Sequence, residues 1–574
     1  MLSNRPSNGE VAMRWVESGD VRLAVFEDGD PARPTLLLVH GYPDTHRVWD
    51  EVVALLRDRF HVVRYDVRGA GASTEPWDRD YGFDRLMDDL SAVLDAVGKP
   101  QVHLVGHDWG SLQGWEAVGR PGILERVASY TSIGGPGLRQ AAHFLRHGRR
   151  REVAAQLVRS WYIGGFMIPR LPELMWSTIL PRLIAQGFGD GVTARAGHPA
   201  ETLVKDAHNG LWLYRSNMRG TLADPDLSPA VGDVPVQLIE ATRDRFVTPA
   251  LLTSIGQWVP RLWHREIAAG HWAQRSHPEL VAGMIAEFAA HVDGAPSSRE
   301  LRRARVGAPR GAFGDRLVVV TGAGSGIGLA TARAFAAHGG EVVCADIDAD
   351  AAARVASGIV KDLGGTAWAK QVDVANIDQM EDFSRNIISE YGVPDIVVNN
   401  AGIAVAGPIL DHTVDDWRRT IDVNLWGVVH GCRLFGAAMV ERGQGGHIVN
   451  VASLAAFAPS RMLPAYAVSK AAVKVLSDCL RAELAGHGIG VSAVCPGFVS
   501  TPLARHATYV GRDLREAAVR GLARRRYPPE RVAAHILRAV HRNQAVVPVN
   551  LEGKIGYALS RISPRAMRGL ARLG

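Results

Sequence analysis

The chain of 574 residues and 61.9 kDa is too long for one ordinary domain, so we expect two to four folding units. Its 47% hydrophobic and 22% charged residues are typical of soluble globular proteins and exclude wholesale disorder, and no run reaches the ~18 consecutive apolar residues of a membrane span. The net charge of +6 is uneven, because residues 505–574 hold 15 basic and 4 acidic residues, a net of +11 that leaves −5 elsewhere.

The first ten residues lack the charged-then-apolar pattern of a secretion signal. All four cysteines lie in the second half of the chain without C-x-x-C spacing, which argues against a disulfide framework and against a zinc site. We therefore expect a cytoplasmic globular protein that holds no metal.

The first half of the chain alternates short apolar runs with helical patterns, which predicts an α/β fold with a mostly parallel sheet between helices. The predicted strands are Leu36–Val39, Val62–Asp66, Val102–Gly106, Val127–Thr131, Val236–Ala241 and Trp263–Ile267. From 132 to about 225 the alternation stops, and a stretch rich in Trp and Arg indicates an inserted helical cap. We assign residues 1–294 to this domain.

A candidate nucleophile follows the third predicted strand. Gly106-His107-Asp108-Trp109-Gly110 has the small-x-nucleophile-x-small pattern of a sharp strand-to-helix turn, with Asp108 at the nucleophile position. A carboxylate that attacks carbon forms an alkyl ester, which suits the opening of an epoxide or a carbon–halide bond rather than ester or peptide hydrolysis. The alternative is a helix N-cap without chemistry, which the flanking glycines argue against.

The partners of this nucleophile follow in the chain order acid, then base. His271 is the candidate base that activates water, and Asp244 fixes its tautomer. His277 is better explained as a residue at the start of a helix. The backbone N–H groups of Tyr42 and Trp109 are expected to form the oxyanion hole.

With these motifs, residues 20–290 resemble the epoxide hydrolase family of α/β hydrolases. The family holds the epoxide oxygen with two cap tyrosines, and Tyr162 and Tyr214 match their sequence contexts. Either tyrosine alone would be explained as a buried packing residue. A haloalkane dehalogenase is the alternative, because Trp109 could line either pocket.

A stretch of Arg, Gly and Pro at residues 295–314 indicates a linker, and a second α/β domain is expected from residue 315 to residue 574. Its predicted strands form a seven-stranded sheet of Rossmann type: Leu317–Thr321, Glu341–Ala345, Trp368–Val372, Ile396–Asn399, His447–Val451, Val491–Cys495 and Ala545–Val549. The two halves share no repeated motif, which indicates a fusion of unrelated domains.

A glycine-rich turn after the first of these strands is expected to bind a dinucleotide. Its spacing is G-x-x-x-G-x-G, and it lets the backbone approach a pyrophosphate at a helix N-terminus. Asp346, 20 residues after Gly326, is placed to hold the adenosine ribose and to repel a 2′-phosphate, which favours NAD over NADP. The turn residues expected at the cofactor are Gly322, Ser325, Gly326, Ile327 and Gly328.

Tyr466 and Lys470 lie four residues apart, on one face of a predicted helix. Lys470, together with the charge of an oxidised nicotinamide, is expected to lower the pKa of Tyr466 so that it exchanges a proton at neutral pH. Ser453 is placed to hold the substrate oxygen. In isolation the Tyr–Lys pair would be a surface helix pair, and the glycine turn upstream argues against that.

Residues 315 to about 550 resemble the short-chain dehydrogenase/reductase family. By that resemblance, Asn424 completes a catalytic tetrad with Ser453, Tyr466 and Lys470, and the family's pairing of long helices implies a homo-oligomer. The resemblance places further residues at the cofactor: Asp373, Val374, Asn400, Val499 and Thr501.

The fusion resembles bifunctional proteins of actinobacterial, including mycobacterial, type. Opening an epoxide gives a vicinal diol, a secondary alcohol that a dehydrogenase could oxidise. Eleven of the 14 tryptophans lie in the first 294 residues, which suggests apolar, lipid-like epoxides as substrates and a role in lipid metabolism. The same enrichment is equally typical of the core of a large hydrolase. The alternatives are a dehalogenase-type hydrolase fused to an unrelated dehydrogenase, or one half that is a silent scaffold.

The basic C-terminal tail, with apolar residues among its arginines, is compatible with an acidic membrane surface. We favour a tail that packs on its own domain or at a subunit interface. The expected partners are small-molecule epoxide, alcohol and ketone substrates, with no nucleic acid.

Overall fold

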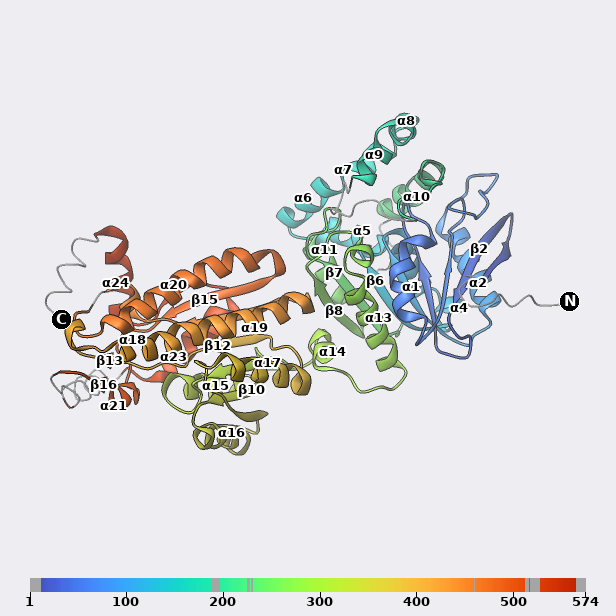
Figure 1. Cartoon of the computed structure of the whole chain (residues 1–574). Helices are drawn as coiled ribbons and strands as arrows, with labels where there is room; N and C mark the ends of the chain where they lie inside the picture. The colour runs from blue at the N-terminus through green and yellow to red at the C-terminus, as the bar shows by residue number, and fades with distance from the viewer. Residues whose placement is uncertain are drawn as a thin grey trace. The chain divides into compact units, whose positions relative to one another are not determined.

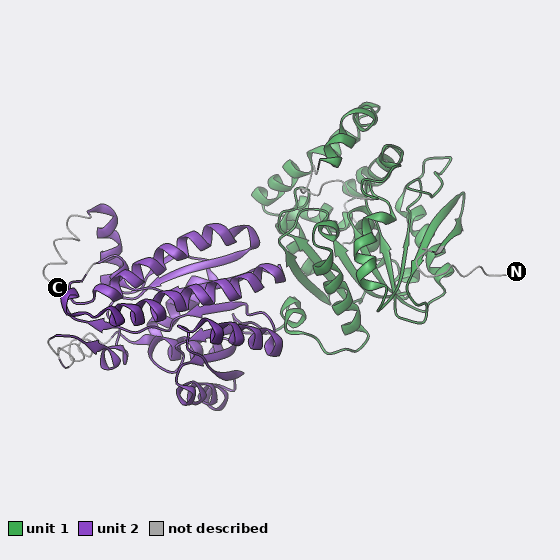
Figure 2. Ribbon diagram, in the orientation of Figure 1, with its two compact units in different colours: residues 1–308 green, residues 309–574 purple. Residues whose placement is uncertain are grey.

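The computed structural model describes residues 12–186, 197–224, 228, 231–458, 460–511, 516 and 527–563. The chain divides into two compact units, residues 1–308 and residues 309–574 (Figure 2). The interval expected to be an exposed linker contains helix α14 (Arg299–Ala304), in which Leu301 is fully buried and its N–H donates to the Ser298 hydroxyl. A serine cap and one buried leucine thus order a segment whose overall composition indicates a linker.

Unit 1 contains an eight-stranded, mostly parallel sheet in the order β1-β2-β4-β3-β5-β6-β7-β8 (Figure 1). The strands are β1 (Ala12–Ser18), β2 (Val21–Asp28), β3 (Thr35–Val39), β4 (His61–Tyr65), β5 (Val102–His107), β6 (Val127–Ile133), β7 (Val236–Ala241) and β8 (Leu262–Ile267). All six predicted strands are present, within two residues at each end. The antiparallel edge strand β1 and its neighbour β2 were both missed. β1 exposes Met13 and Trp15 and lacks a continuous apolar run, whereas β2 was missed although residues 23–26 form one.

Alternate strand residues of unit 1 face two layers of helices. Leu37 and Val39 pack in one cluster with α2 and α3, whereas Leu36 and Leu38 pack in another with α1 and α13. The helices are α1 (Asp50–Leu56), α2 (Phe83–Val97), α3 (Trp109–Ala117), α4 (Pro121–Leu124), α11 (Pro249–Ser254), α12 (Ala273–Ser276) and α13 (Pro278–Val292). Those of the cap, between β6 and β7, are α5 (Leu138–His147), α6 (Arg150–Arg159), α7 (Trp161–Phe166), α8 (Leu171–Thr178), α9 (Leu180–Ala185) and α10 (Leu203–Ala223).

Unit 2 contains the predicted seven-stranded parallel sheet, in the order β11-β10-β9-β12-β14-β15-β17, and a small sheet of β13 and β16. The strands are β9 (Leu317–Thr321), β10 (Glu341–Asp346), β11 (Ala367–Gln371), β12 (Ile396–Asn399), β13 (Val405–Ala406), β14 (Gly446–Val451), β15 (Ile489–Cys495), β16 (Thr508–Tyr509) and β17 (Val546–Pro548). The helices are α15 (Gly326–Ala337), α16 (Ala349–Leu363), α17 (Ile377–Tyr391), α18 (Val414–Ile421), α19 (Gly427–Arg442), α20 (Pro464–Leu484), α21 (Leu503–His506), α23 (Pro529–His541) and α24 (Leu551–Ile562). In the part of the chain that the structure describes, both units are therefore α/β, as predicted.

One helical stretch among the described residues, Val414–Arg442, is long and apolar enough to cross a membrane, and half of its apolar window is buried. Phe435 and Met439 of this stretch are fully buried in the same cluster as strand residues of the unit 2 sheet. Its apolar character therefore has a sufficient explanation in the packing of unit 2.

Candidate active sites

Asp108 lies at the turn between β5 and α3, in a backbone conformation that L-residues rarely adopt, with φ of 51° and ψ of −120°. A Cβ on Gly106 would overlap the Gly110 carbonyl, and a Cβ on Gly110 would overlap the Val39 carbonyl of β3. Both glycines are therefore needed for the turn, which holds the Asp108 carboxylate at the carboxyl end of the sheet.

Three side chains from separate loops meet at this end of the sheet. The His271 Nε2 lies 3.4 Å from the Asp108 Oδ2, and the His271 Nδ1 donates to the Asp244 Oδ2 at 2.8 Å. The Asp244 Oδ1 accepts from the backbone N–H groups of Phe246 and Val247, at 2.7 and 3.1 Å. The geometry brings the three predicted residues together, with Asp244 fixed on the far side of the imidazole from Asp108.

The charge state of His271 follows from this arrangement. Burial disfavours the imidazolium, but the charge of Asp244 and the hydrogen bonds to Asp108 and Asp244 outweigh burial and hold the pKa of His271 well above its usual value. Part of this effect belongs to the Asp108 charge, so neutralisation of Asp108 lowers the pKa of His271.

The loop after β3 supplies the predicted oxyanion-hole amide. The Tyr42 N–H donates to the Asp108 Oδ1 at 2.8 Å, and Trp109 is the first residue of α3, where N–H groups have no intrahelical acceptor. His40 braces this loop, because its Nδ1 donates to the Gly41 carbonyl at 2.9 Å and its Nε2 accepts from the Val67 N–H at 2.9 Å. Burial lowers the pKa of His40, which keeps this bracing imidazole neutral.

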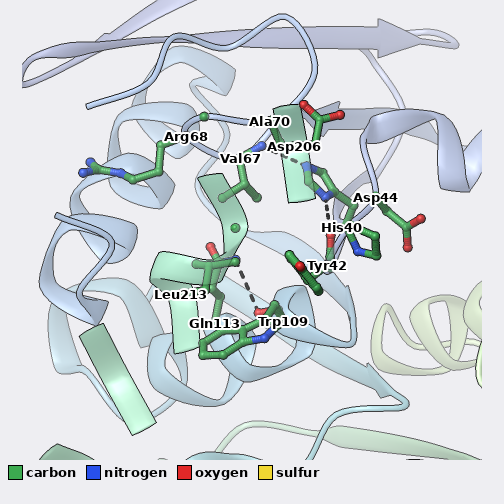
Figure 3. Close-up of a pocket in the computed structure, with 14 residues that line it drawn as sticks. His40, Tyr42, Asp44, Val67, Arg68, Ala70, Trp109, Gln113, Asp206 and Leu213 are labelled. Atoms are coloured by element: carbon green, nitrogen blue, oxygen red, sulfur yellow. Dashed lines mark hydrogen bonds between the residues drawn. The ribbon is translucent and has the colours of Figure 1, made fainter. Parts of the chain in front are cut away.

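A cavity of about 20 Å³ lies beside this loop. Figure 3 shows residues that line it, among them His40, Tyr42, Trp109, Gln113 and Asp206. This volume suits about one water molecule and is far below the 300 Å³ or more of an ordinary ligand pocket. Asp108 and His271 do not line it. The cavity therefore lies among the residues that hold this loop in place, and it is too small to be the substrate pocket.

The two predicted cap tyrosines face each other near the nucleophile. Their ring centroids are 6.3 Å apart; Tyr162 of α7 also packs against Phe246, and Tyr214 of α10 packs against Trp109. Burial and the nearby Asp108 charge raise the pKa of both phenols, which therefore stay protonated and can donate. The cap thus brings two neutral O–H donors to the site.

One buried group of this region was missed at the sequence level. Asp44, four residues after His40, accepts from the Trp272 indole N–H at 2.8 Å and pairs with the His198 Nε2 of the cap at 2.9 Å. Burial opposes its ionisation, but His198, with help from His107 and Trp272, lowers the pKa of Asp44 to about 2. The sequence offered one signal for this group, a carboxylate in the loop after β3. In the structure Asp44 joins the loop that carries Tyr42 to Trp272, the residue after His271.

In unit 2, a cleft of about 960 Å³ lies at the carboxyl ends of the strands. Of the predicted cofactor and catalytic residues, only Gly328 and Asn424 do not line it. Those that line it are Gly322, Ser325, Gly326, Ile327, Asp346, Asp373, Val374, Asn400, Ser453, Tyr466, Lys470, Val499 and Thr501. The cleft is large enough for a dinucleotide beside a substrate.

The glycine turn between β9 and α15 is closely packed. The Gly324 N–H donates to the Asp346 Oδ2 at 2.8 Å, and the Asn400 Nδ2 donates to the carbonyls of Thr321 and Gly322. A Cβ on Gly328 would overlap the Gly322 carbonyl and lie 2.6 Å from the Asn400 Nδ2. Gly328 therefore does not line the cleft, but the lack of a side chain at this position allows the turn to pack closely.

We expect Gly328→Ala to destabilise unit 2 by about 1–3 kcal/mol, because the new methyl group must displace backbone, and to weaken dinucleotide binding at least tenfold. Gly436→Ala in α19 is the matched control, since its Cβ would make only ordinary contacts at 3.7 and 3.9 Å. Thermal unfolding and quenching of protein fluorescence by NAD measure the two effects. Equal NAD affinity in the two variants would contradict the assigned role of the turn.

The candidate catalytic pair of unit 2 lies on α20. Lys470 is buried, its Nζ donates to the Val451 carbonyl at 2.8 Å, and burial lowers its pKa to about 8. Burial raises the pKa of Tyr466, and a hydrogen bond with Ser453 opposes this only in part. Lys470 alone therefore does not produce the expected lowering of the Tyr466 pKa. Its Nζ lies 5.8 Å from the centre of the Tyr466 ring.

Asn424 lies in a π-helical turn, Asp422–Trp426, between α18 and α19. Its Oδ1 accepts from the Ile403 N–H at 2.8 Å, and its Nδ2 donates to the Ile403 carbonyl and to the Ser469 hydroxyl. A Cβ on Gly402 would lie 3.1 Å from the Asn424 Oδ1 and 3.5 Å from the Lys470 Nζ, so this glycine keeps the space between them open. Single π-turns of this kind are frequent at functional sites.

The described part of the basic tail includes α24, which lies against the turn after Ser453. The Tyr557 ring packs on Phe457 with centroids 5.1 Å apart, and a Cβ on Gly556 would overlap Leu454. This part of the tail therefore packs on its own unit. The arginines from residue 565 onward lie outside the described residues.

Two family models match the chain: alpha/beta hydrolase fold over residues 34–159 and short chain dehydrogenase over residues 316–509. The "Probable oxidoreductase EphD" of Mycobacterium tuberculosis (strain H37Rv) is 42% identical over 587 residues, which cover 98% of each chain. The "Putative oxidoreductase SadH" of that strain is 33% identical over 266 residues, covering 46% of this chain and 96% of that protein. A crystal structure of a short-chain dehydrogenase/reductase from Burkholderia phymatum in complex with NAD is 29% identical and covers 45% of this chain and 95% of its own, with a TM-score of 0.41.

Proposed function

Since the chain belongs to the two-domain family of the mycobacterial EphD oxidoreductases, an α/β hydrolase joined to a short-chain dehydrogenase, we propose that it is a bifunctional enzyme. Unit 1 hydrolyses an apolar epoxide to a vicinal diol. Unit 2 interconverts a secondary alcohol and a ketone with a nicotinamide cofactor. The observation that carries the first activity is Asp108 at the elbow, in reach of both His271 and the Tyr42 N–H.

Hydrolysis by unit 1 takes two steps. The Asp108 carboxylate attacks a ring carbon, the carbon–oxygen bond breaks, and the ring oxygen takes a proton from Tyr162 or Tyr214 to give a hydroxyalkyl ester. Neutral His271 then removes a proton from water, and the resulting hydroxide adds to the ester carbonyl. The amides of Tyr42 and Trp109 stabilise the oxyanion, and its collapse expels the substrate oxygen, which takes the proton from His271 to complete the diol. The carboxylic acid proton of Asp108 returns to the tyrosine that gave up its own, which restores the starting charges of the site.

The pH dependence of the two steps is expected to differ. Attack needs ionised Asp108, whereas ester hydrolysis needs His271 without its proton, and the pKa of His271 in the free enzyme stands above its usual value. Esterification removes the Asp108 charge and so lowers the pKa of His271, and we expect the ester to accumulate as the pH falls below this lowered pKa and to turn over as the pH rises. Rapid quenching followed by intact-protein mass spectrometry at pH 5.5 and pH 8 measures this. Equal ester occupancy at both pH values would contradict it.

A haloalkane dehalogenase remains the second candidate for unit 1. A leaving halide is held by indole or amide N–H groups, and Trp109 is adjacent to Asp108. The two protonated tyrosines favour the epoxide, because a ring-opening alkoxide needs a proton and a halide does not.

The residues of the unit 2 cleft fit a dinucleotide. The glycine positions leave room where a Cβ would collide, and Asp346 ends β10 beside the turn. Gly326 begins α15, whose first N–H groups would hold the pyrophosphate of a bound dinucleotide. The bound nicotinamide would supply or accept the hydride. Tyr466 exchanges the proton of the substrate oxygen, Ser453 holds that oxygen, and Lys470 stabilises the phenolate. The Asp346 carboxylate favours NAD over NADP.

Mass spectrometry of products from a panel of aromatic and fatty-acid epoxides, with and without NAD, tests the proposal. Diol in both reactions, and hydroxyketone only with NAD, supports two activities that act in sequence. Diol that is never oxidised with NAD or NADP would exclude the sequence and leave two separate enzymes. If no epoxide is turned over, the proposal for unit 1 fails and haloalkanes become the substrates to test.

A further inference from the structure

The outer helices of the cap carry an unusual concentration of exposed apolar side chains. Eight of the 28 exposed large hydrophobic residues among the described residues fall within the 23 residues from Leu157 to Ile179. Trp161 is 73% exposed, Val158 is 72% exposed and Leu174 is 61% exposed. Apolar residues gathered in this way on a soluble unit mark a surface that contacts another apolar phase.

These residues follow helical spacing. Ala154, Leu157, Val158 and Trp161, which we call the first cap stripe, lie at positions i, i+3, i+4 and i+7 along α6 and the start of α7. Leu171, Leu174, Met175 and Ile179, the second cap stripe, lie at i, i+3, i+4 and i+8 along α8. A surface helix ordinarily turns such a stripe toward the core, but these helices bury Gln156 and Trp176 instead and present the stripes to solvent.

Exposed arginines extend both stripes. Arg150 and Arg151 precede the first cap stripe by one turn, and Arg170 and Arg182 flank the second. From Arg146 to Arg182 the chain has seven arginines and two glutamates, a net charge of +5, although residues 1–504 together carry −5. Apolar stripes bordered by arginine are complementary to the acyl chains and headgroups of an anionic bilayer.

The active site lies directly beneath this surface. Tyr162 packs against Phe246 and Tyr214 inside unit 1, whereas its neighbour Trp161 is exposed. Figure 1 shows α6, α7, α9 and α8 as an outer row of unit 1. One short helix, α7, thus carries both the last residue of the first cap stripe and, next to it in the chain, the cap tyrosine at the site.

We propose that the two cap stripes dock unit 1 on an anionic lipid bilayer, from which it takes its apolar epoxide. The docking itself does not depend on the proposed function. The second part of the proposal, that the epoxide comes from the bilayer, rests on the proposed function. Docking by these helices places α7, and with it Tyr162, at the lipid surface, so that an apolar substrate reaches the site without crossing bulk water.

Flotation of the full chain with vesicles tests the docking, using phosphatidylcholine alone and phosphatidylcholine mixed with phosphatidylglycerol. We expect at least tenfold stronger binding to the anionic vesicles, weakened by salt. Val158→Ser combined with Leu174→Ser, one exposed residue from each stripe, is expected to weaken binding at least tenfold, because each change removes an aliphatic side chain from the lipid. Arg150→Glu combined with Arg151→Glu lowers the net charge of this segment from +5 to +1 and is expected to weaken the preference for anionic lipid.

The matched control is Ile409→Ser combined with Leu410→Ser, an exposed aliphatic pair of unit 2, which is expected to bind like the unmodified chain. Stripe variants that bind vesicles like this control would overturn the docking. So would sedimentation velocity showing a dimer that only the stripe variants dissociate, because the occupant would then be a second copy of the chain.

Turnover of a water-soluble epoxide such as styrene oxide, measured without vesicles, separates the two claims. Turnover without vesicle binding leaves the hydrolase proposal standing and overturns the docking. Vesicle binding without turnover of any epoxide overturns the hydrolase proposal and leaves the docking standing.

Discussion

His271→Gln is expected to convert unit 1 into an enzyme that reacts with one epoxide molecule and then stops. The Asp108 carboxylate remains able to attack, because its turn is set by Gly106 and Gly110 and its Oδ1 still accepts from the Tyr42 N–H. Water activation fails without the imidazole, so we expect turnover to fall about 10³-fold or more while the ester persists. Intact-protein mass spectrometry should show one adduct with the mass of the epoxide.

Two companion variants make this result specific. Asp108→Asn should form no adduct and should lose turnover, because a neutral amide is a poor nucleophile at this position. His277→Gln, six residues from His271 at the start of α13, should turn over normally. Steady turnover by His271→Gln would refute the role of His271 in ester hydrolysis, and an adduct on a residue other than Asp108 would refute Asp108 as the nucleophile.

Local patterns are enough to predict most of the structure that positions these residues. Most strands of both sheets with continuous apolar runs were predicted, because burial on both faces leaves such a run in the sequence. The exception is β2, which was missed although residues 23–26 form an apolar run. β1 could not be predicted in this way, since half of its residues face solvent. The helix α14 was missed because a count of Arg, Gly and Pro reveals neither the burial of Leu301 nor the Ser298 cap.

The candidate sites show a similar division. Asp108, Asp244 and His271 could be predicted because each follows a strand, and the carboxyl ends of parallel strands meet at one edge of the sheet. The bonds of Asp44 to Trp272 and His198 could not, since they join residues 228 and 154 positions apart through the fold. The pKa of Tyr466 is raised by burial, which a hydrogen bond with Ser453 opposes only in part, and the sequence does not reveal that burial.

The raised pKa of Tyr466 determines what we expect of alcohol oxidation by unit 2. Tyr466→Phe should reduce alcohol oxidation at least 10³-fold, because the phenol is the group in the cleft placed to exchange the substrate proton. Lys470→Met should reduce it by about 10²-fold or more. The remaining rate should rise only at higher pH, since the phenolate has lost the cation that stabilises it at neutral pH, below the Lys470 pKa of about 8.

The neighbouring lysine provides the control for this shift. Lys474 lies one turn further along α20 and pairs with Asp478 at 2.6 Å, away from the cleft, so Lys474→Met should keep the unmodified pH profile. Profiles of kcat/KM for oxidation, measured with saturating NAD, distinguish the two lysines. If Lys470→Met loses rate without any shift to higher pH, Lys470 acts by holding β14 through the Val451 carbonyl rather than by its charge at Tyr466. Epoxide hydrolysis by the same variants should remain unchanged, because the residues of that reaction all lie in unit 1.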